Sequence, residues 1–251
     1  MGVQPIALPN SLAENPSELT YSTKIQSLTG SSVEIADPRA TRAMIALMDT
    51  AAVLGGAASH YGGPAAFAEL MASVHGYMFR EASLANQPWY EMFHFVNDGG
   101  HCENGLYALK CNYGFAGINL EELKGFRSIN SRLTGHGEVH VFPEGVLLSN
   151  GPLGSALPQA QGLAMADALS GRKRTTWVAL TDGAAMEGEA REALAAIPGF
   201  ASRGKLAPFV LVVSDNNTKL TGRIDSEAYS MQPTFAALSD LGWKVLSVED
   251  G

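Results

Sequence analysis

The sequence is short of cysteine and of long apolar runs, and each shortage excludes a class of protein. Only two cysteines, Cys102 and Cys111, occur in 251 residues. Their number and spacing fit neither a disulfide framework nor a zinc site, so both are expected to be ordinary thiols. No apolar run approaches the roughly 18 residues needed to cross a bilayer, and the N-terminus lacks a signal-peptide pattern. We therefore expect a cytoplasmic, soluble protein without a membrane partner.

Positive charge is also scarce. Lys and Arg number 17 against 25 Asp and Glu, which gives a net charge of -8. Such a surface repels phosphate at long range, so a general nucleic-acid or anionic-membrane binder is excluded. The sequence also lacks the Gly-Lys-Ser/Thr of a P-loop and the Gly-x-Gly-x-x-Gly of a dinucleotide site. Any phosphate must be held by local donors or by a metal ion.

What is present is an apolar fraction of 46%, enough for a sizeable core. Residues 1–36 are rich in Ser, Pro, Asn and Thr without periodicity, and we expect an irregular N-terminal arm there. Residues 37–251 are expected to form one α/β domain. It opens with Asp37 as N-cap and Pro38 at the first position of a helix that ends near Leu54.

The rest of the chain alternates strand and helix patterns, which predicts a parallel sheet with helices on both faces. An early strand from Phe93 ends in a glycine turn, with a helix from about Glu103. Asn119 and Glu122 form a capping box. Later strands are expected at 176–181, 208–214 and 243–248, and helices at 151–169, 186–197 and 226–241.

Two of these strands end in residues suited to a metal ion. Asp182 follows the strand 176–181, and Asn216 and Thr218 follow the strand 208–214. Ligands of parallel sheets bind at the carboxyl ends of the strands, and if these strands are neighbours their tips converge. Carboxylate, amide and backbone oxygens suit Mg²⁺, with Ca²⁺ or Mn²⁺ as alternatives. The plainer interpretation is an Asp-Gly turn and a strand-capping Asp-Asn-Asn.

A glycine turn lies close to this pattern in the sequence. Gly151-Pro152-Leu153-Gly154 precede a run of small residues that predicts a helix. The free N–H groups and positive dipole end of such a helix could receive an anion, and glycines let backbone approach it. Alone, a Gly-Pro-x-Gly turn is a weak signal.

The order of these motifs resembles the N-terminal, diphosphate-binding domain of the transketolase family from about residue 40 onward. Thr181-Asp182-Gly183 with Met186-Glu187-Gly188, followed by Asn216, is similar to the thiamine diphosphate motif, which begins Gly-Asp-Gly. The other matching segments are Gly151-Pro152-Leu153-Gly154, Phe126-Arg127 with Thr134-Gly135-His136, Gly100-His101, and Ser59-His60 with Gly63-Pro64.

The resemblance implies thiamine diphosphate and a divalent metal as cofactors and a ketose-to-aldose transfer of a two-carbon unit. It implies metal ligation by Asp182, Asn216 and the carbonyl of Thr218. The residues that it places around the cofactor are Gly151, Leu153, Gly154, Gly183 and Leu220, and those that it places as catalytic are His60, His101, His136 and Glu187. In the family, this glutamate is buried and couples active sites across a subunit interface. The chain departs from the pattern at Thr181, Gly99 and Ser155-Ala156, which leaves affinity and substrate choice open.

In the family, a glutamate on a second, pyrimidine-binding domain activates the cofactor. This chain ends at Gly251, where a transketolase would continue, so we expect either a split gene or a fragment. The expected partners are a second polypeptide with the pyrimidine-binding and C-terminal domains, a sugar or sugar phosphate, and further subunits of an oligomer. Two alternatives stay open: another thiamine diphosphate enzyme, deoxyxylulose-phosphate synthase-like or dehydrogenase-like, and a non-catalytic regulatory module.

Overall fold

The structure, a computed structural model, describes residues 11–16, 18–219 and 222–248 and divides into two compact units. The helical unit comprises residues 11–92 and 100–151. The sheet unit comprises the described residues of 93–99 and 152–251. Each unit contains one group of the predicted site residues, and each is described by itself.

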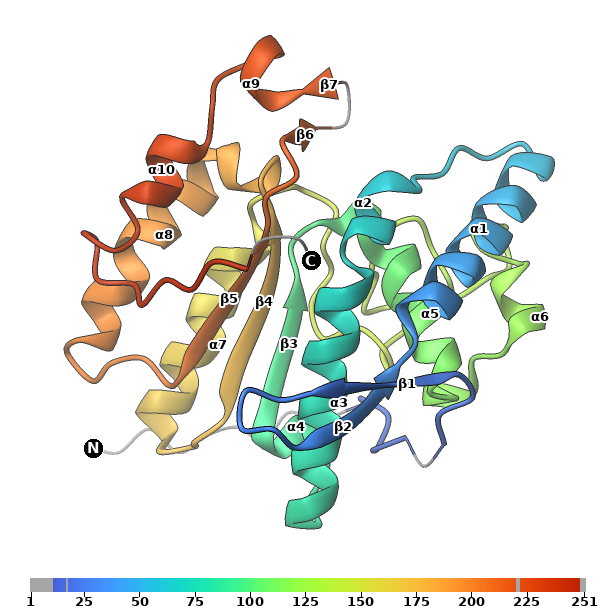
Figure 1. Ribbon diagram of the computed structural model, residues 1–251, viewed down its shortest axis with the longest axis horizontal. Helices are drawn as coiled ribbons and strands as arrows, with labels where there is room; N and C mark the ends of the chain where they lie inside the picture. The colour runs from blue at the N-terminus through green and yellow to red at the C-terminus, as the bar shows by residue number, and fades with distance from the viewer. Residues whose placement is uncertain (1–10, 17, 220–221, 249–251) are drawn as a thin grey trace. The chain divides into compact units, whose positions relative to one another are not determined.

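The sheet unit is built on three parallel strands, β3 (Phe93–Asn97), β4 (Thr175–Thr181) and β5 (Phe209–Ser214), in the order β3-β4-β5 (Figure 1). Helices α7 (Ala156–Ser170) and α8 (Gly188–Ala201) flank the sheet. This confirms the predicted α/β class. The smaller elements are η3 (Ala184–Met186), β6 (Thr218–Lys219), β7 (Gly222–Arg223), α9 (Ile224–Glu227) and α10 (Gln232–Ala236).

Strand β4 runs through the middle of this sheet. Val178, Ala179 and Leu180 are at most 1% exposed, whichever way their side chains point. A strand that is buried on both faces needs consecutive apolar residues, and that is the composition from Trp177 to Leu180. The burial holds the end of β4, and therefore Asp182, in a defined place.

Two predictions near the C-terminus are wrong. The expected helix 226–241 is interrupted after α9, where Ala228 has φ -136° and ψ -104°, and α10 starts anew with Pro233 in its first turn. The expected strand 243–248 is irregular. Its alternation suits a strand, but a strand also needs a neighbour to complete the hydrogen-bond ladder, and none of the described residues pairs with it.

The helical unit confirms the predicted first helix, α1 (Pro38–Leu54), in which the Asp37 side chain accepts from Arg39 N at 2.8 Å. Asn119 likewise caps α6 (Leu120–Leu123), and a helix begins at Glu103 as expected. The remaining elements are α2 (Gly62–Ala66), α3 (Ala68–Ala85), α4 (Trp89–Met92), η1 (Gly100–Cys102), α5 (Glu103–Asn112) and η2 (Phe115–Gly117).

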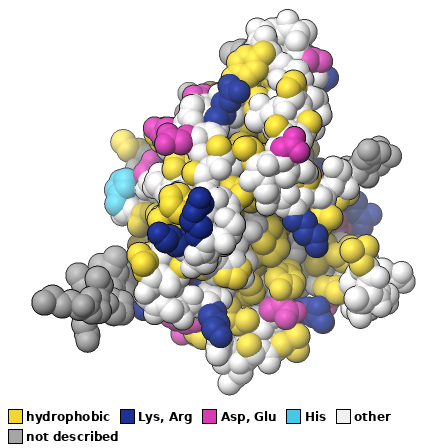
Figure 2. All heavy atoms as spheres, turned by 90° about the vertical axis from the view of Figure 1, so that its left-hand side faces the viewer, with side chains coloured by type: hydrophobic (Ala, Val, Ile, Leu, Met, Phe, Trp, Pro, Cys, Tyr) yellow, Lys and Arg dark blue, Asp and Glu magenta, His cyan; other side chains and the backbone are white. Residues whose placement is uncertain are grey.

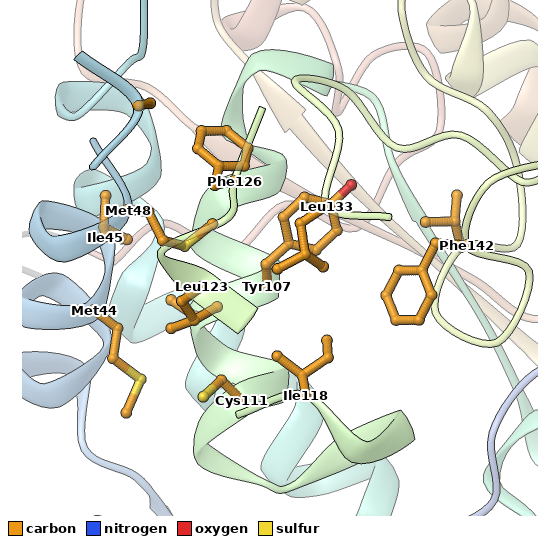
Figure 3. Packing of buried hydrophobic residues seen from close by; sticks show 13 residues of the cluster. Met44, Ile45, Met48, Tyr107, Cys111, Ile118, Leu123, Phe126, Leu133 and Phe142 are labelled. Carbon is orange, nitrogen blue, oxygen red and sulfur yellow. The ribbon is translucent and has the colours of Figure 1, made fainter. Parts of the chain in front are cut away.

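An apolar cluster joins α1, α5 and α6 to the loop that follows them (Figure 3). Tyr107 of α5 lies at its centre and is fully buried. Its ring centroid is 6.1 Å from that of Phe142 and 6.2 Å from that of Phe126. The irregular segment 124–150 therefore contributes large side chains to the core and is anchored by them.

The prediction of an irregular arm over 1–36 is wrong for residues 22–36. Strands β1 (Ser22–Gln26) and β2 (Ser32–Ala36) form an antiparallel hairpin, whose turn contains Gly30 at φ +82°. The hairpin is held by burial of Ile35 and Ala36, which contact elements distant in the sequence. Residues 1–10 and 17 lie outside the described part of the chain.

On the face drawn in Figure 2, described side chains of both charges are interspersed with hydrophobic ones. No single sign of charge gathers into a large patch on this face. Among residues 11–16, 18–219 and 222–248, no helix combines the length and the apolar content needed to cross a bilayer.

Candidate functional site

The carboxyl ends of β4 and β5 lie side by side in the sheet unit, as the metal-site prediction requires. Thr181 pairs with Ser214 in the parallel register, and the N–H of Asp182 donates to Ser214 O at 3.1 Å. The ladder therefore continues one residue past β4. Asp182 and the segment that begins at Asp215 are thereby brought to the same edge of the sheet.

Asp182 presents a carboxylate with spare acceptor capacity. Its side-chain Oδ1 accepts from Gly183 N at 2.9 Å, while Oδ2 is buried and has no hydrogen-bond partner among the described residues. Burial raises the pKa of Asp182, and the nearby charge of Asp215 raises it further, whereas backbone N–H groups of Gly183 and Asn217 lower it. A buried, unpartnered carboxylate oxygen is costly unless a cation or donor meets it.

The loop after β5 provides further oxygen atoms near this carboxylate. Backbone N–H groups of Asn217 and Thr218 help to lower the pKa of Asp182, so this loop lies close to the carboxyl group. Asn216 is exposed, and its Oδ1 accepts from Thr218 N at 2.9 Å. An amide oxygen has two lone pairs, so one is left for a ligand. These hard oxygen donors fit a divalent cation such as Mg²⁺.

The glycine turn before α7 differs from the prediction. The helix begins at Ala156, not at Gly151, and the protein's own Asp98 occupies its N-terminus. Asp98 is fully buried, and its carboxylate accepts from Gly154 N at 2.6 Å and from Leu157 N at 2.8 Å. The expectation that this helix end offers free N–H groups to an anion is therefore wrong.

Sequence reasoning missed Asp98 because its partners lie more than fifty residues later in the chain. Burial raises the pKa of Asp98, while the hydrogen bonds from Gly154, Leu157 and Ala156 lower it. An acidic residue directly after a buried strand and before two glycines is the signal that could have drawn attention to it.

Two other predicted residues of the sheet unit, Gly154 and Glu187, lie close to Asp98. Gly154 is buried at φ +83°, and a Cβ there would approach Glu187 Cβ to 2.5 Å, so only glycine fits. Glu187 itself is exposed at the N-cap of α8, and Leu153 is half-buried. Leu220 lies outside the described residues. Gly151, which belongs to the helical unit, is half-buried.

The three predicted histidines converge in the helical unit, although they come from three separate segments: His60 and His136 lie in loops, and His101 lies in η1. The ring centroids of His60 and His101 are 5.5 Å apart, in an edge-to-face arrangement. Gly100 has no room for a side chain, because a Cβ would lie 2.8 Å from His136 Cδ2 and 2.0 Å from Asn150 O. All three histidines are half-buried.

The electrostatics of this cluster favour neutral imidazoles at His60 and His101. Burial lowers the pKa of His101 to about 4, and the neighbouring His60 and His136 add to the effect. Burial lowers the pKa of His60 as well, followed by the charge of Arg127. His101 Nδ1 is buried and has no hydrogen-bond partner among the described residues. A neutral ring with an unused nitrogen can donate or accept a hydrogen bond near pH 7.

Arg127 belongs with this cluster, although only its motif was recognised in the sequence. Its Nη1 donates to Ala58 O at 2.7 Å, and its Nε is buried with no hydrogen-bond partner in the described residues. Arg127 has φ +62°, a strained conformation for arginine. A Cβ on Gly135 would lie 2.8 Å from Arg127 Nη2, so the guanidinium packs directly against Gly135. The guanidinium is thus held against the loop that contains His136.

The three remaining histidines, which match no motif, lie elsewhere in ordinary surroundings. His75 is buried with Nδ1 2.9 Å from Met71 O, and His94 is buried with Nε2 2.9 Å from Asp167 Oδ2. His140 is exposed. The described residues contain no group of three or more His, Cys, Asp or Glu side chains placed to hold a metal ion.

Comparison with known proteins identifies the family of this chain. Residues 38–251 match the family model described as "Transketolase, thiamine diphosphate binding domain". The transketolase of Rhodobacter capsulatus is 34% identical over 192 residues, which is 71% of this chain and 27% of that protein. The chloroplastic transketolase of Solanum tuberosum is 34% identical over 176 residues, 66% of this chain and 23% of its own length.

Solved structures give the same result. The transketolase from Leishmania mexicana superposes on this chain with a TM-score of 0.61 and 27% sequence identity. The superposed region covers 81% of this chain and 31% of the Leishmania chain. The chain therefore spans about a quarter to a third of the length of the relatives that it matches.

Proposed function

The chain belongs to the transketolase thiamine diphosphate-binding domain family, and from that premise we propose that it is the diphosphate- and metal-binding part of a ketol-transferring enzyme. The reaction would move a two-carbon unit from a ketose to an aldose. The observation that carries the proposal is the buried, unpartnered Asp182 Oδ2 beside the loop at Asn216, at the carboxyl edge of a parallel sheet.

Asp182, Asn216 and the carbonyl of Thr218 would hold Mg²⁺, or Ca²⁺ or Mn²⁺ in its place, which in turn would bind the diphosphate. When bound, thiamine diphosphate supplies the carbon centre that stabilises a carbanion. Gly183 would lie against the diphosphate. The backbone and side chains proposed to line the rest of the cofactor are Gly151, Leu153, Gly154 and Leu220.

The histidine cluster would serve the sugar. His60, His101 and His136 present ring nitrogens that can donate to or accept from hydroxyl groups, and the lowered pKa of His101 keeps it neutral at pH 7. Glu187 is exposed in the single chain, and we assign it to a subunit interface, where a neighbouring subunit would bury it.

The proposal includes a partner. The chain spans 27% of the Rhodobacter capsulatus transketolase. A second polypeptide, or the remainder of a longer chain of which this is a fragment, would contribute the pyrimidine-binding and C-terminal domains. The purified chain alone is expected to show no ketol transfer, and addition of the second polypeptide with thiamine diphosphate and Mg²⁺ is expected to restore it. Full activity of the chain alone would contradict the need for a partner.

The reconstituted enzyme also distinguishes the two alternative functions, another thiamine diphosphate enzyme and a non-catalytic module. If pyruvate replaces ketoses as the preferred donor, the chain belongs to another thiamine diphosphate enzyme. A non-catalytic module is favoured by one observation: Asp98, not a ligand, occupies the α7 N-terminus. Calorimetry separates the cases, because a module without cofactor shows no Mg²⁺-dependent heat of thiamine diphosphate binding, alone or with the second polypeptide.

A further inference from the structure

Helix α5 turns an unusual row of side chains towards the loop that contains His136. Glu103, Tyr107 and Lys110 follow the i, i+4, i+7 spacing that places residues on one face of a helix. Each is at most 6% exposed, although two of the three are charged. Buried charges are retained only with partners, and here the partners belong to the segment 131–150, which we call the His136 loop.

Glu103 holds the C-terminal end of this loop. Its Oε2 accepts from Asn150 Nδ2 at 2.9 Å, and Asn150 Oδ1 in turn accepts from Gly137 N at 2.6 Å. The backbone N–H of Asn150 returns a bond to Gly137 O at 3.1 Å. Three hydrogen bonds therefore link α5 to the residue that directly follows His136.

Tyr107 and Lys110 hold the loop at two further points. The Tyr107 hydroxyl donates to His136 O at 3.4 Å, from a ring fixed in the apolar cluster of Figure 3. Lys110 Nζ donates to Gly145 O at 2.6 Å and lies 3.8 Å from Glu103 Oε1. The ion pair compensates both charges, although burial still lowers the pKa of Lys110.

We propose that Glu103, Tyr107 and Lys110 are positioning residues that hold the His136 loop, and with it the His136 imidazole, against Gly100 and His101. Their role in catalysis rests on the proposed function, because it acts through His136. The positioning itself does not, because it concerns only contacts within the helical unit.

The positioning is tested by amide hydrogen exchange on the full chain, without cofactor or partner. In Tyr107→Phe, which keeps the ring and removes one hydroxyl, we expect the Gly137 amide to exchange several-fold faster. The Leu109 amide within α5 should change less than twofold. Tyr113→Phe is the matched control. It removes a buried hydroxyl of the same unit, but this hydroxyl interacts with the backbone of Ala36 and not with the His136 loop. Equal acceleration at Gly137 and Leu109 indicates general destabilisation and overturns the proposal, as does no change at Gly137.

The ion pair is tested by variants that avoid leaving one charge buried alone. The double variant Glu103→Gln with Lys110→Met carries no charge at either position and keeps an acceptor for the Asn150 side chain. The exchange rate of the Gly137 amide should therefore stay close to that of the wild type. Gly145 O loses its donor, so the Val146 amide should exchange about tenfold faster. Adding Asn150→Ala to this variant should release Gly137 as well. The assigned contacts would be refuted by the reverse pattern, in which the Gly137 amide exchanges faster in the double variant while the exchange of the Val146 amide is unchanged.

The catalytic consequence is read separately in the reconstituted enzyme. Tyr107→Phe should lower kcat about tenfold while the KM for thiamine diphosphate stays within twofold, since the residues proposed to bind metal lie in the sheet unit. Unchanged kcat together with faster exchange at Gly137 would overturn the catalytic role of the positioning. Absence of ketol transfer in the wild type itself would contradict the proposed function and leave the exchange result standing.

Discussion

The two units place their candidate site residues by different physical means. In the sheet unit, Asp182 directly follows a buried strand, and the ladder between β4 and β5 determines where it lies. In the helical unit, His60 and His136 come from loops and His101 from the short helix η1, and buried polar side chains such as Glu103 hold the loop of His136 in place.

The difference concerns which changes each site should tolerate. A site at strand ends is maintained by backbone hydrogen bonds, which most substitutions preserve. A site on loops depends on particular side chains, because loops have few backbone partners of their own. Substitutions distant from the chemistry should therefore disturb the helical unit more than the sheet unit.

The largest expected contrast is with pH, through His75 of the helical unit. Burial, followed by the charge of Lys110, lowers its pKa to about 3. In the unfolded chain His75 binds a proton near pH 6.5, whereas in the folded chain it does so only near pH 3. The stability of the fold is therefore unaffected by this group above pH 6.5, and it decreases as the pH falls below that value. Between pH 7 and pH 4 the free energy of unfolding should fall by about 3 kcal/mol from this group.

Urea unfolding at pH 7 and pH 4 checks this expectation. The variant His75→Gln keeps an N–H donor for Met71 O and should show a shallower loss on acidification. His140→Gln, at an exposed position, should behave as the wild type. An unchanged pH dependence in His75→Gln would contradict the assignment.

The second contrast concerns the metal ligands. Asp182→Ala removes the buried carboxylate and should weaken Mg²⁺-dependent binding of thiamine diphosphate at least about a hundredfold, because loss of the principal charged ligand leaves only neutral oxygens. Calorimetry measures this, with Asp240→Ala as an exposed aspartate of the same unit for comparison. Equal affinities of the two variants would remove Asp182 from the metal site.

A third comparison uses Asp98 of the sheet unit. Asp98→Ala leaves the buried N–H groups of Gly154 and Leu157 without their acceptor, and should lower the free energy of unfolding by about 2 kcal/mol. Asp98→Asn can still accept one of the two bonds and should lie between the alanine variant and the wild type. A loss below about 0.5 kcal/mol in Asp98→Ala would show that water replaces the carboxylate there.

The smallest effect is expected at the exposed cap of α6. Asn119 accepts from Glu121 N and Glu122 N, both at 3.0 Å, on the surface of the helical unit. Asn119→Ala should cost at most about 1 kcal/mol, because water can solvate the released groups. Chemical unfolding measures it, and a loss as large as that of Asp98→Ala would contradict the assumed role of burial.

Sequence patterns predicted the local features correctly. The N-cap at Asp37, the strand before Asp182 and the N-cap at Asn119 each depend on residues within a few positions of one another. The reciprocal half of the predicted capping box is absent among the described residues, because the Glu122 carboxylate accepts from Arg132. The expected helix 226–241 failed because periodicity does not report the backbone break at Ala228.

Long-range polar contacts were beyond such patterns. Asp98 and Glu103 would be expected on the surface by composition, yet both are buried with partners about fifty residues away. Nothing in the spacing of either residue names its partner, since only the packed chain brings the two together.

The sequence by itself determined the family, the α/β class, and the position of Asp182 and Asn216 at two strand ends, because these follow from local periodicity and motif order. Only the tertiary structure decided that these two strands are neighbours, that the three histidines converge, and that Asp98 rather than a ligand occupies the start of α7. The reason is that hydrogen-bond partners and burial depend on which distant segments pack together, and local sequence does not specify those contacts.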